Sequence, residues 1–228
     1  MLTVVQHFIQ RDILRSLSRH GSQSFSELRP DGIANNLFGY HLKQLINNGI
    51  VERKNEHYSL TAAGIQYVSL ATRTNIDILP SPKIFCLLII ENDSGNFIMH
   101  TRNASPFVGQ YTFPGGSLFY GESLGELTQR QLIEKVGLQI QLTHKGIANI
   151  RHQHGSNVWS HNYAHIYYAK VDGSPRIRSK DARFTPAWIN ISEVNDERLM
   201  PDIREILGAT KDNKDFFYLE ITQHSYID

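Results

Sequence analysis

A glycine-rich loop that leads into an amphipathic helix, residues 115–138 (GGSLFYGESLGELTQRQLIEKVGL), constrains the fold of this chain most strongly. Ser123-x-x-Glu126 is a capping-box pattern, in which two side chains satisfy free backbone N–H groups of the first helical turn. Apolar residues at fourfold spacing give the helix one core face: Leu124, Leu132 and Val136. Gly137 stands where a left-handed C-terminal cap is usual. The pattern predicts a helix from about Leu124 to Val136.

The same stretch resembles the Nudix box, GX5EX7REUXEEXGU, in which U is a bulky aliphatic residue. The matching positions, with their usual lead-in, are Phe113, Pro114, Gly115, Gly116, Glu122, Arg130, Gly137 and Leu138. The resemblance implies an α/β/α sandwich that binds nucleoside diphosphate derivatives. In active members of the family it also implies hydrolysis of these compounds with Mg²⁺ or Mn²⁺.

The metal-binding part of the box, REUXEE in the family, reads RQLIEK over residues 130–135. Gln131, Glu134 and Lys135 share one helix face, because they are spaced i, i+3, i+4. Three carboxylates on this face would suit a hard divalent cation. Here one carboxylate stands beside an amide and an ammonium group. Glu134 is therefore the one candidate metal ligand of the box, and we expect Mg²⁺ binding to be impaired. Glu122 and Arg130 keep the family's residues, and the resemblance implies that Arg130 orients the loop and the helix.

Length and composition suit one large domain or two small ones, with 228 residues, 40% hydrophobic residues and a net charge of +1. The longest apolar run, Ile84–Ile90, has seven residues and is too short to span a bilayer. The N-terminus shows neither a basic region nor a signal cleavage site. A single cysteine, Cys86, excludes an internal disulfide. These features predict a cytoplasmic protein without a membrane partner.

Residues 1–75 show helical periodicity followed by a β-hairpin pattern. The expected elements are three helices, two strands and a last helix, over residues 4–17, 25–28, 33–48, 50–54, 57–60 and 61–70. This order, with the text YHLKQLINNGIVERKNEHYSLTAAGIQYV, resembles the winged helix-turn-helix family. The resemblance implies that the third helix enters the major groove of duplex DNA and that the hairpin wing touches the DNA backbone or the minor groove.

Several polar residues of this unit are candidates for DNA contact: Asn36, Tyr40, Lys43 and Asn47 on the outer side of the third helix, and Arg53 and Lys54 in the wing. Lys43 and the wing pair suit phosphate contacts, whereas Asn36 suits a base edge. Residues 1–75 hold eight Lys+Arg against five Asp+Glu, which is a mild positive excess. Dimerisation or protein contact through the winged helix is the alternative.

The helical periodicity stops at Ala71, and Pro80-Ser81-Pro82 predicts a stiff extended connector. The sequence therefore predicts an α+β chain with a winged helix over residues 1–75, a linker over 76–83 and a Nudix domain over 84–228. The strands expected in this second domain lie at 84–90, 96–102, 142–154, 158–171 and 187–189, with a helix from about residue 201. The strand-like tail, residues 211–228, is expected either to join the sheet edge or to cross to a second subunit.

Candidate ligand-binding residues lie in the glycine-rich loop and in two strands. Gly115 and Gly116 belong to the loop, and Arg102 suits a phosphate, although a solvated surface role suits it equally. Alternating residues of the strand 158–171 point to one face and suit a stacked base or ribose: Trp159, His161, Tyr163, His165 and Tyr167. A half-buried sheet face packed on a helix is the alternative. A transition-metal site that includes His152 and His154 is a third.

Three functions remain open from the sequence. The first is a dimeric DNA-binding regulator whose impaired Nudix domain senses a small nucleotide-like ligand. This arrangement resembles the Nudix-related transcriptional regulators, which usually carry the two domains in the opposite order. The second is a working Mg²⁺-dependent Nudix hydrolase with an accessory winged helix. The third is an interaction module without a ligand.

Overall fold

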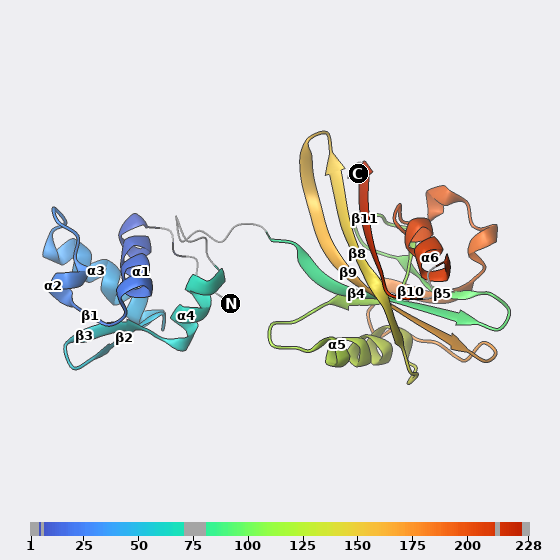
Figure 1. Ribbon diagram of the computed structural model, residues 1–228, viewed down its shortest axis with the longest axis horizontal. Helices are drawn as coiled ribbons and strands as arrows, with labels where there is room; N and C mark the ends of the chain where they lie inside the picture. Colours follow the sequence, from blue (N-terminus) through green and yellow to red (C-terminus); the bar gives the residue numbers. More distant parts are fainter. Residues whose placement is uncertain (1–4, 6, 71–80, 213–214, 225–228) are drawn as a thin grey trace. The chain divides into compact units, whose positions relative to one another are not determined.

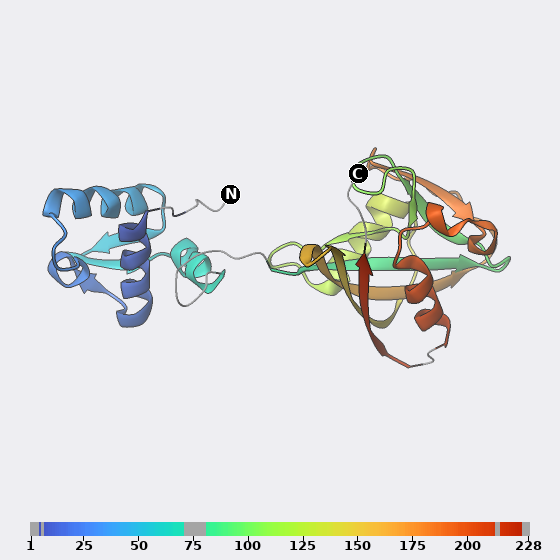
Figure 2. The same cartoon turned by 90° about the horizontal axis from the view of Figure 1, so that it is seen from above.

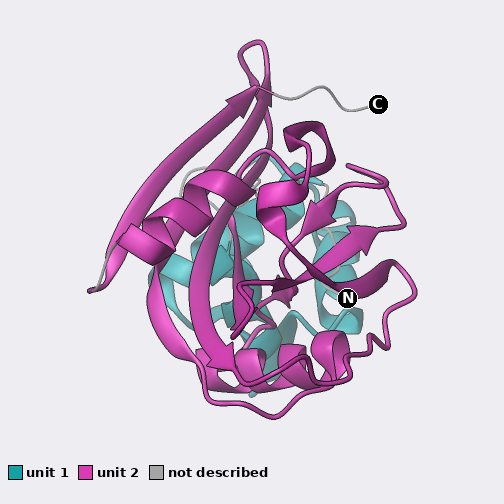
Figure 3. Cartoon of the chain, turned by 90° about the vertical axis from the view of Figure 1, so that its right-hand side faces the viewer, with its two compact units in different colours: residues 1–80 teal, residues 81–228 magenta. Residues whose placement is uncertain are grey.

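The computed structural model describes residues 5, 7–70, 81–212 and 215–224. The chain divides into two compact units, residues 1–80 and residues 81–228 (Figure 3). In the described ranges, no helix has both the length and the apolar character that crossing a bilayer requires. Val4 and most of the predicted connector, residues 71–80, lie outside the described residues.

The first unit combines helices with a small antiparallel sheet (Figure 1). Its elements are α1 (Phe8–His20), β1 (Gln23–Ser24), α2 (Phe25–Leu28), α3 (Asn35–Asn47), β2 (Val51–Lys54), β3 (His57–Leu60) and α4 (Ala62–Leu70), which is the predicted order with the short strand β1 added. The strand order is β1-β3-β2. Helices α1 and α3 bury their apolar faces in one core, which contains Ile13, Leu14, Phe38 and Leu42. The periodicity of the sequence predicted the helices and the hairpin, with the first helix a few residues too early, and it did not predict β1.

The second unit is organised around an eight-stranded mixed sheet. The main path is β10-β5-β4-β9-β8-β11, and two short strands, β6 and β7, pair with β5 and β4. The strands are β4 (Lys83–Asn92), β5 (Phe97–Arg102), β6 (Tyr111–Thr112), β7 (Gly115–Ser117), β8 (Thr143–His154), β9 (Asn157–Val171), β10 (Phe184–Ile189) and β11 (Phe217–His224). β4 and β9 pair in parallel over ten residues and form the centre of the sheet.

Helices cover both faces of this sheet. Helix α6 (Ile203–Asp212) buries Ile203 and Ile206 in a core with residues of one face, such as Leu87. Helix α5 (Leu124–Gln131) contributes Leu127 to the core on the other face, which includes Cys86. The unit is therefore a helix–sheet–helix sandwich (Figure 1). Short 3₁₀ turns at Ile191–Glu193 and Asp196–Arg198 lead into α6.

The predicted loop–helix junction is present, with one difference in its last turn. Ser123 and Glu126 form the reciprocal capping box, and α5 continues as a π-helical turn over Leu132–Val136. Gly137 ends the turn with φ 74°, a left-handed conformation in which its N–H donates to the Leu132 carbonyl at 2.7 Å. Single π turns inside helices often occur at functional sites. This one carries Lys135, and Gln131, the other altered Nudix-box position, directly precedes it.

The C-terminal tail completes the sheet of its own chain. β11 pairs in parallel with β8, from Phe217 opposite Gly146 to His224 opposite Gln153. It lies at the edge of the sheet, as Figure 2 shows from above. Of the two placements that the sequence left open, the structure has the edge strand.

Candidate functional site

A cavity of about 920 Å³ in the second unit opens between the sheet, the glycine-rich loop and the π-helical turn. Its walls come from β4, β5, β7, β9, the π turn and the segment 180–184. Six cationic side chains line it: Lys83, Arg102, Arg130, Lys135, Lys180 and Arg183. Three acidic side chains do so: Glu134, Asp181 and Asp202. This excess of cations favours an anionic ligand.

The glycine-rich loop packs tightly against the helix and the sheet. Gly115 and Gly116 pair with Leu87 and Cys86 of β4. A Cβ atom at Gly115 would lie 2.0 Å from the Cys86 carbonyl oxygen, and one at Gly116 would lie 2.5 Å from the Gln131 side chain. Both predicted glycines line the cavity, and close backbone approach is the reason that these positions exclude larger residues.

Arg130 and Glu122 hold the loop to the helix. The Arg130 guanidinium donates from Nε and Nη2 to both Glu122 oxygens at 2.7 and 2.8 Å, and Nη2 also donates to the Ser117 carbonyl at 3.0 Å. The same guanidinium lies 3.9 Å from the centre of the Phe119 ring. These bonds from Arg130 lower the pKa of Glu122. Arg130 therefore links the glycine-rich loop to the helix.

Gln131 is buried and its amide groups find partners within the protein. In the orientation that satisfies both groups, Nε2 donates to the Gly115 carbonyl at 2.9 Å and Oε1 accepts from Arg130 Nη1 at 2.6 Å. Glu134 lines the cavity, its side chain is 47% exposed, and it lies 3.9 Å from Arg130 Nη1. The predicted metal face thus has one exposed carboxylate.

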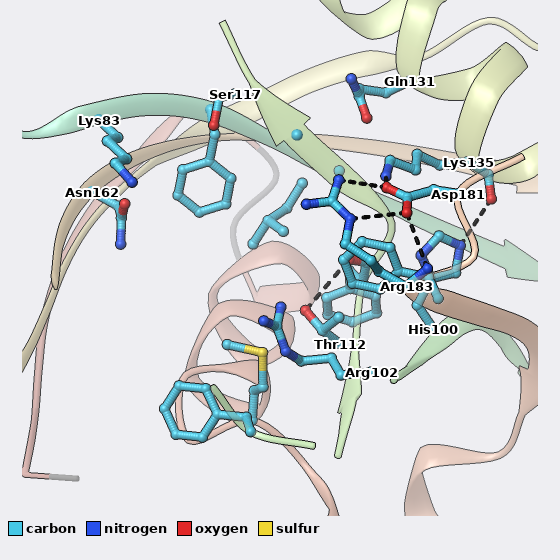
Figure 4. A pocket seen from close by; sticks show the side chains of 18 of the residues that line it. Lys83, His100, Arg102, Thr112, Ser117, Gln131, Lys135, Asn162, Asp181 and Arg183 are labelled. Atoms are coloured by element: carbon cyan, nitrogen blue, oxygen red, sulfur yellow. Dashed lines mark hydrogen bonds and ion pairs between the residues drawn. The ribbon is translucent and has the colours of Figure 1, made fainter. Parts of the chain in front are cut away.

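Lys135, the other altered position, is buried in an ion pair with Asp181 (Figure 4). Its ammonium group also lies 4.5 Å from the centre of the Phe184 ring. Arg183 donates to Asp181 from Nε and Nη2 at 2.9 and 2.7 Å. Hydrogen bonds from Arg183, followed by those from Lys135, lower the pKa of Asp181 despite its partial burial.

The segment that carries Asp181 is attached to the π turn by backbone hydrogen bonds. Arg178 N–H donates to the Val136 carbonyl at 2.9 Å, and Lys180 N–H donates to the Glu134 carbonyl at 2.7 Å. From β5, His100 Nε2 donates to the Lys135 carbonyl at 2.8 Å. Burial lowers the pKa of His100 to about 4. Among the described residues, no group of three or more His, Cys, Asp or Glu side chains is placed to hold a metal ion.

The predicted aromatic row of β9 is divided between two sides of the sheet. Trp159 lines the cavity together with Ser160 and Asn162, whereas His161, Tyr163 and His165 are absent from the described lining. A register irregularity is the cause, since His152 pairs with Ser160 and Gln153 pairs with Val158, which leaves Trp159 unpaired. The strict alternation that the sequence predicts is therefore wrong at Trp159.

The three remaining residues of the row make contacts on the opposite side of β9. His161 Nε2 donates to Asn149 Oδ1 at 2.8 Å, and the His161 and Tyr163 rings lie 5.6 Å apart. The ring nitrogens of His165 and His144 lie 3.2 Å apart. Tyr167 packs in the core that includes α5. The prediction that these rings share one ligand pocket with Trp159 does not agree with this arrangement.

Sequence reasoning missed several residues of the cavity. Asp181 and Arg183 come from the segment before β10, and no local motif marked them. Asp202 and Phe107 also line the cavity, as does His152, which the sequence suggested only for a transition-metal site. Arg102, which was predicted, lines it as well, and its Nε donates to the Pro106 carbonyl at 2.7 Å. Burial lowers the pKa of Arg102.

The polar residues predicted to contact DNA are exposed in the first unit. Asn36, Tyr40, Lys43 and Asn47 lie on the outer side of α3, opposite the buried Phe38, Leu42 and Leu45. Arg53 and Lys54 are exposed in β2, where Arg53 pairs with Glu56 at 2.6 Å and Lys54 with Glu52 at 2.8 Å.

Residues 81–209 match the family described as NUDIX domain, which is more than half of the chain. This protein belongs to the Nudix family, as the motif at residues 115–138 suggested. Members of this family generally use a divalent metal ion such as Mg²⁺. No match was found among curated proteins.

Two solved structures show the same fold at low sequence identity. The NUDIX domain of Shewanella oneidensis NrtR, complexed with ADP ribose, is 16% identical with a TM-score of 0.52, over 67% of this chain and 98% of that chain. A mutator MutT protein from Bacillus halodurans is 16% identical with a TM-score of 0.53, over 64% of this chain and 93% of that chain. At this identity the likeness concerns the fold alone.

Proposed function

We propose that this protein is a dimeric DNA-binding transcription regulator, and that its Nudix domain senses a nucleoside-diphosphate-type ligand without hydrolysing it efficiently. The observation that carries the proposal is the Lys135–Asp181 ion pair. At a position where the Nudix box has a metal-binding glutamate, the chain has an ammonium group. That ammonium group neutralises the Asp181 carboxylate, which lines the cavity.

The donor set does not fit a Mg²⁺ site. Hard divalent cations need several free carboxylate or carbonyl oxygens. Gln131 is saturated by Gly115 and Arg130, and Asp181 is shared by two cations. Glu134 alone offers an exposed carboxylate. Without metal to stabilise the developing negative charge, hydrolysis loses a contribution of about several kcal/mol.

The cavity nevertheless suits an anionic ligand. Its excess of cationic side chains supplies direct partners for a diphosphate group, and guanidinium groups bind phosphate oxygens in bidentate geometry. The NUDIX domain of S. oneidensis NrtR was solved with ADP ribose, which contains such a diphosphate. That ligand belongs to a protein of similar fold, and it supports the ligand class proposed for this cavity.

The first unit suits duplex DNA as a winged helix-turn-helix. Helix α3 exposes a polar face, and the β2–β3 hairpin carries two cations at its exposed end. The ion pairs of Arg53 and Lys54 are exposed, and such pairs contribute little stability. These cations are therefore free to exchange their glutamate partners for DNA phosphates.

A working hydrolase with an accessory winged helix is the second candidate. The exposed carboxylate of Glu134, beside the family's Arg130 and Glu122, is the observation that favours it. Mg²⁺-dependent turnover of a panel of nucleoside diphosphate compounds by the unaltered chain would establish this function and overturn the sensor proposal.

The regulator proposal is tested by measuring DNA binding with the full chain. We expect affinity for the protein's own upstream DNA, and Lys43→Ala should weaken binding to all duplexes and lower the salt slope by about one. Asn36→Ala should instead reduce discrimination between DNA sequences. Asp31→Asn, in the exposed turn before α3, is a control that should leave the salt slope unchanged. No affinity at low salt would contradict the proposal.

Coupling between the units is tested by titrating nucleotides during the same measurement. A ligand shifts DNA binding only if it binds the DNA-bound and free forms with different affinity. We expect a several-fold change in DNA affinity, which corresponds to a coupling of about 1–3 kcal/mol. Glycines in place of Pro80 and Pro82 should reduce this change. A nucleotide that binds the Nudix domain tightly without altering DNA affinity would contradict the proposed coupling between ligand binding and DNA binding.

A further inference from the structure

Helix α3 exposes two large apolar side chains beside the polar residues proposed to contact DNA. Leu37 is 47% exposed and Tyr40 is 59% exposed, whereas Phe38 and Leu42 of the same helix are buried. Residues spaced i, i+3 are neighbours on a helix surface, so Leu37 and Tyr40 form one apolar patch. A single exposed apolar side chain is common, but two adjacent ones on a proposed binding face indicate a partner with an apolar group at that place.

Tyr40 is held in place at the surface by its neighbours. Gln44 Nε2 donates to the Tyr40 hydroxyl at 3.0 Å, and the Tyr40 ring lies edge-on to the His41 ring, with centres 5.2 Å apart. The His41 ring is buried and stacks on the ring of His7, the N-cap of α1, with centres 3.9 Å apart. A side chain that is ordered before binding loses less conformational entropy when it binds. Tyr40 therefore presents its ring to a partner in a fixed position.

The charges around these two residues favour a polyanionic partner. The 13 residues of α3 include no aspartate or glutamate, and the exposed Lys43 follows Tyr40 by about one helical turn on the same side. Residues 1–75 hold eight Lys+Arg against five Asp+Glu. Among the base edges in the major groove of duplex DNA, the apolar group is the C5-methyl group of thymine. This methyl group is therefore the part of DNA that suits Leu37 and Tyr40.

We propose that Leu37 and Tyr40 read thymine in the major groove through its methyl group, at two neighbouring base pairs. Residues three apart in a helix are separated by about 4.5 Å along its axis. Successive base pairs are about 3.4 Å apart, so the two side chains reach neighbouring base pairs. The inference rests on the proposed function, because α3 must lie in the major groove. It adds a base preference to that function and assigns Leu37 as a residue that determines it.

The inference is tested with duplexes that differ only in the methyl group of thymine. The full-length protein first selects its preferred sequence from a pool of duplexes with a random central segment. The selected duplex is then synthesised with thymine or with uracil, which lacks that methyl group. Both affinities are measured by fluorescence anisotropy at one low salt concentration. We expect thymine at two neighbouring selected positions and at least about tenfold weaker binding of the uracil duplex, since one buried methyl group contributes about fourfold.

Substitutions in α3 separate a direct contact from an effect of uracil on the stiffness of the DNA. Leu37→Ala and Tyr40→Ala should each lower the ratio of thymine-duplex to uracil-duplex affinity about fourfold. The double variant should bring this ratio within about twofold of one. Tyr40→Phe is the matched control, because it keeps the ring and loses the hydroxyl group, and it should retain the parent's ratio within about twofold.

The ratio is measured within each variant, so a general loss of DNA affinity leaves it unchanged. The inference is overturned if the selected sequence lacks the neighbouring thymines, or if the parent binds the two duplexes equally. It is also overturned if an alanine variant keeps the parent's ratio, which would assign the preference for thymine to the deformability of the DNA. Failure of the parent to bind any duplex of the pool overturns the proposed function as well, so the two failures are distinguishable.

Discussion

Arg130 and Lys135 are two cations on one helical segment, and each pairs with a carboxylate, but the two pairs differ in origin. Arg130 and Glu122 both keep the residues of the Nudix box, and their bidentate bond fixes the glycine-rich loop to the helix. Lys135 replaces a glutamate of the box and pairs with Asp181 from outside it. The comparison teaches that the residues that build the loop–helix frame can persist while those that bind the metal change.

The frame has a structural reason to persist. Arg130 contacts the loop at Ser117, Phe119 and Glu122, and it also satisfies Gln131. Loss of Arg130 would remove a partner of Glu122, of the Ser117 carbonyl and of the buried Gln131 at once. The Lys135 position instead meets a separate segment, residues 178–184, so a change there can be compensated by one carboxylate.

The largest expected effect on the free energy of unfolding comes from restoring the family's carboxylates at positions 131 and 135. Gln131→Glu with Lys135→Glu would place two new carboxylates beside Glu134 and Asp181, and these suit Mg²⁺. Without metal their mutual repulsion destabilises the second unit, and Mg²⁺ at about 100 times its Kd should stabilise it by about 2.7 kcal/mol. The measurement is urea unfolding with and without Mg²⁺, followed by fluorescence of Trp159 and Trp188, the two tryptophans of the chain.

Lys135→Met is the matched control, because it removes the ammonium group without adding a carboxylate. The parent and this control should show no stabilisation by Mg²⁺. Equal stabilisation of the parent and the double variant by Mg²⁺ would mean that the site beside Lys135 already binds metal in the parent. The metal-binding residues would then not have been lost, which contradicts the comparison of Lys135 with Arg130.

The second-largest effect concerns Arg130, which keeps the residue of the Nudix box. Arg130→Ala should lower the free energy of unfolding of the second unit by about 2–3 kcal/mol, because it leaves Glu122 and the Ser117 carbonyl without their partner. Arg183→Ala is the control, since the Arg183 side chain is 69% exposed, and it should cost less than about 1 kcal/mol. Similar losses in both variants, by tryptophan fluorescence in urea, would contradict the frame role of Arg130.

Local signals explain which parts of this comparison were visible in the sequence. The capping box of Ser123 and the cap at Gly137 act within a few residues, so the helix was predicted closely. The changes at Gln131 and Lys135 were visible as departures from the motif. Asp181 was not, because it follows Lys135 by 46 residues and reaches it only through the placement of β10 beside β5.

Two further features depend on sheet pairing that no local pattern records. The alternation of β9 predicted one face for Trp159 and His161, but the register irregularity beside His152 turns Trp159 into the cavity. The tail was predicted as a strand from its apolar pattern, whereas its parallel partner β8 follows from long-range packing. The local patterns therefore predicted the two strands, but neither the irregularity at Trp159 nor the partner of β11.

The smallest expected effect concerns Asp181, the partner of Lys135, and the dependence of its contribution to stability on pH. The folded state lowers the pKa of Asp181 from its ordinary value of 3.8, mainly through the bonds from Arg183. A lowered pKa means that this stabilisation is present above pH 3.8 and is lost as the pH falls through the folded-state pKa. Asp181→Asn should therefore cost about 1–2 kcal/mol at pH 7 and progressively less below about pH 3.8.

The measurement is again tryptophan fluorescence in urea, at pH values between 7 and 3. Asp196→Asn serves as the control, since its side chain is 74% exposed and pairs with Arg204 at the surface. It should change the free energy of unfolding by less than about 1 kcal/mol at every pH. If Asp181→Asn behaves like this surface control, the ion pair with Lys135 contributes no stability of its own. Position 135 could then accept a carboxylate and a metal ion without a loss of stability. Arg130 and Lys135 would differ only in how much each contributes to the free energy of unfolding.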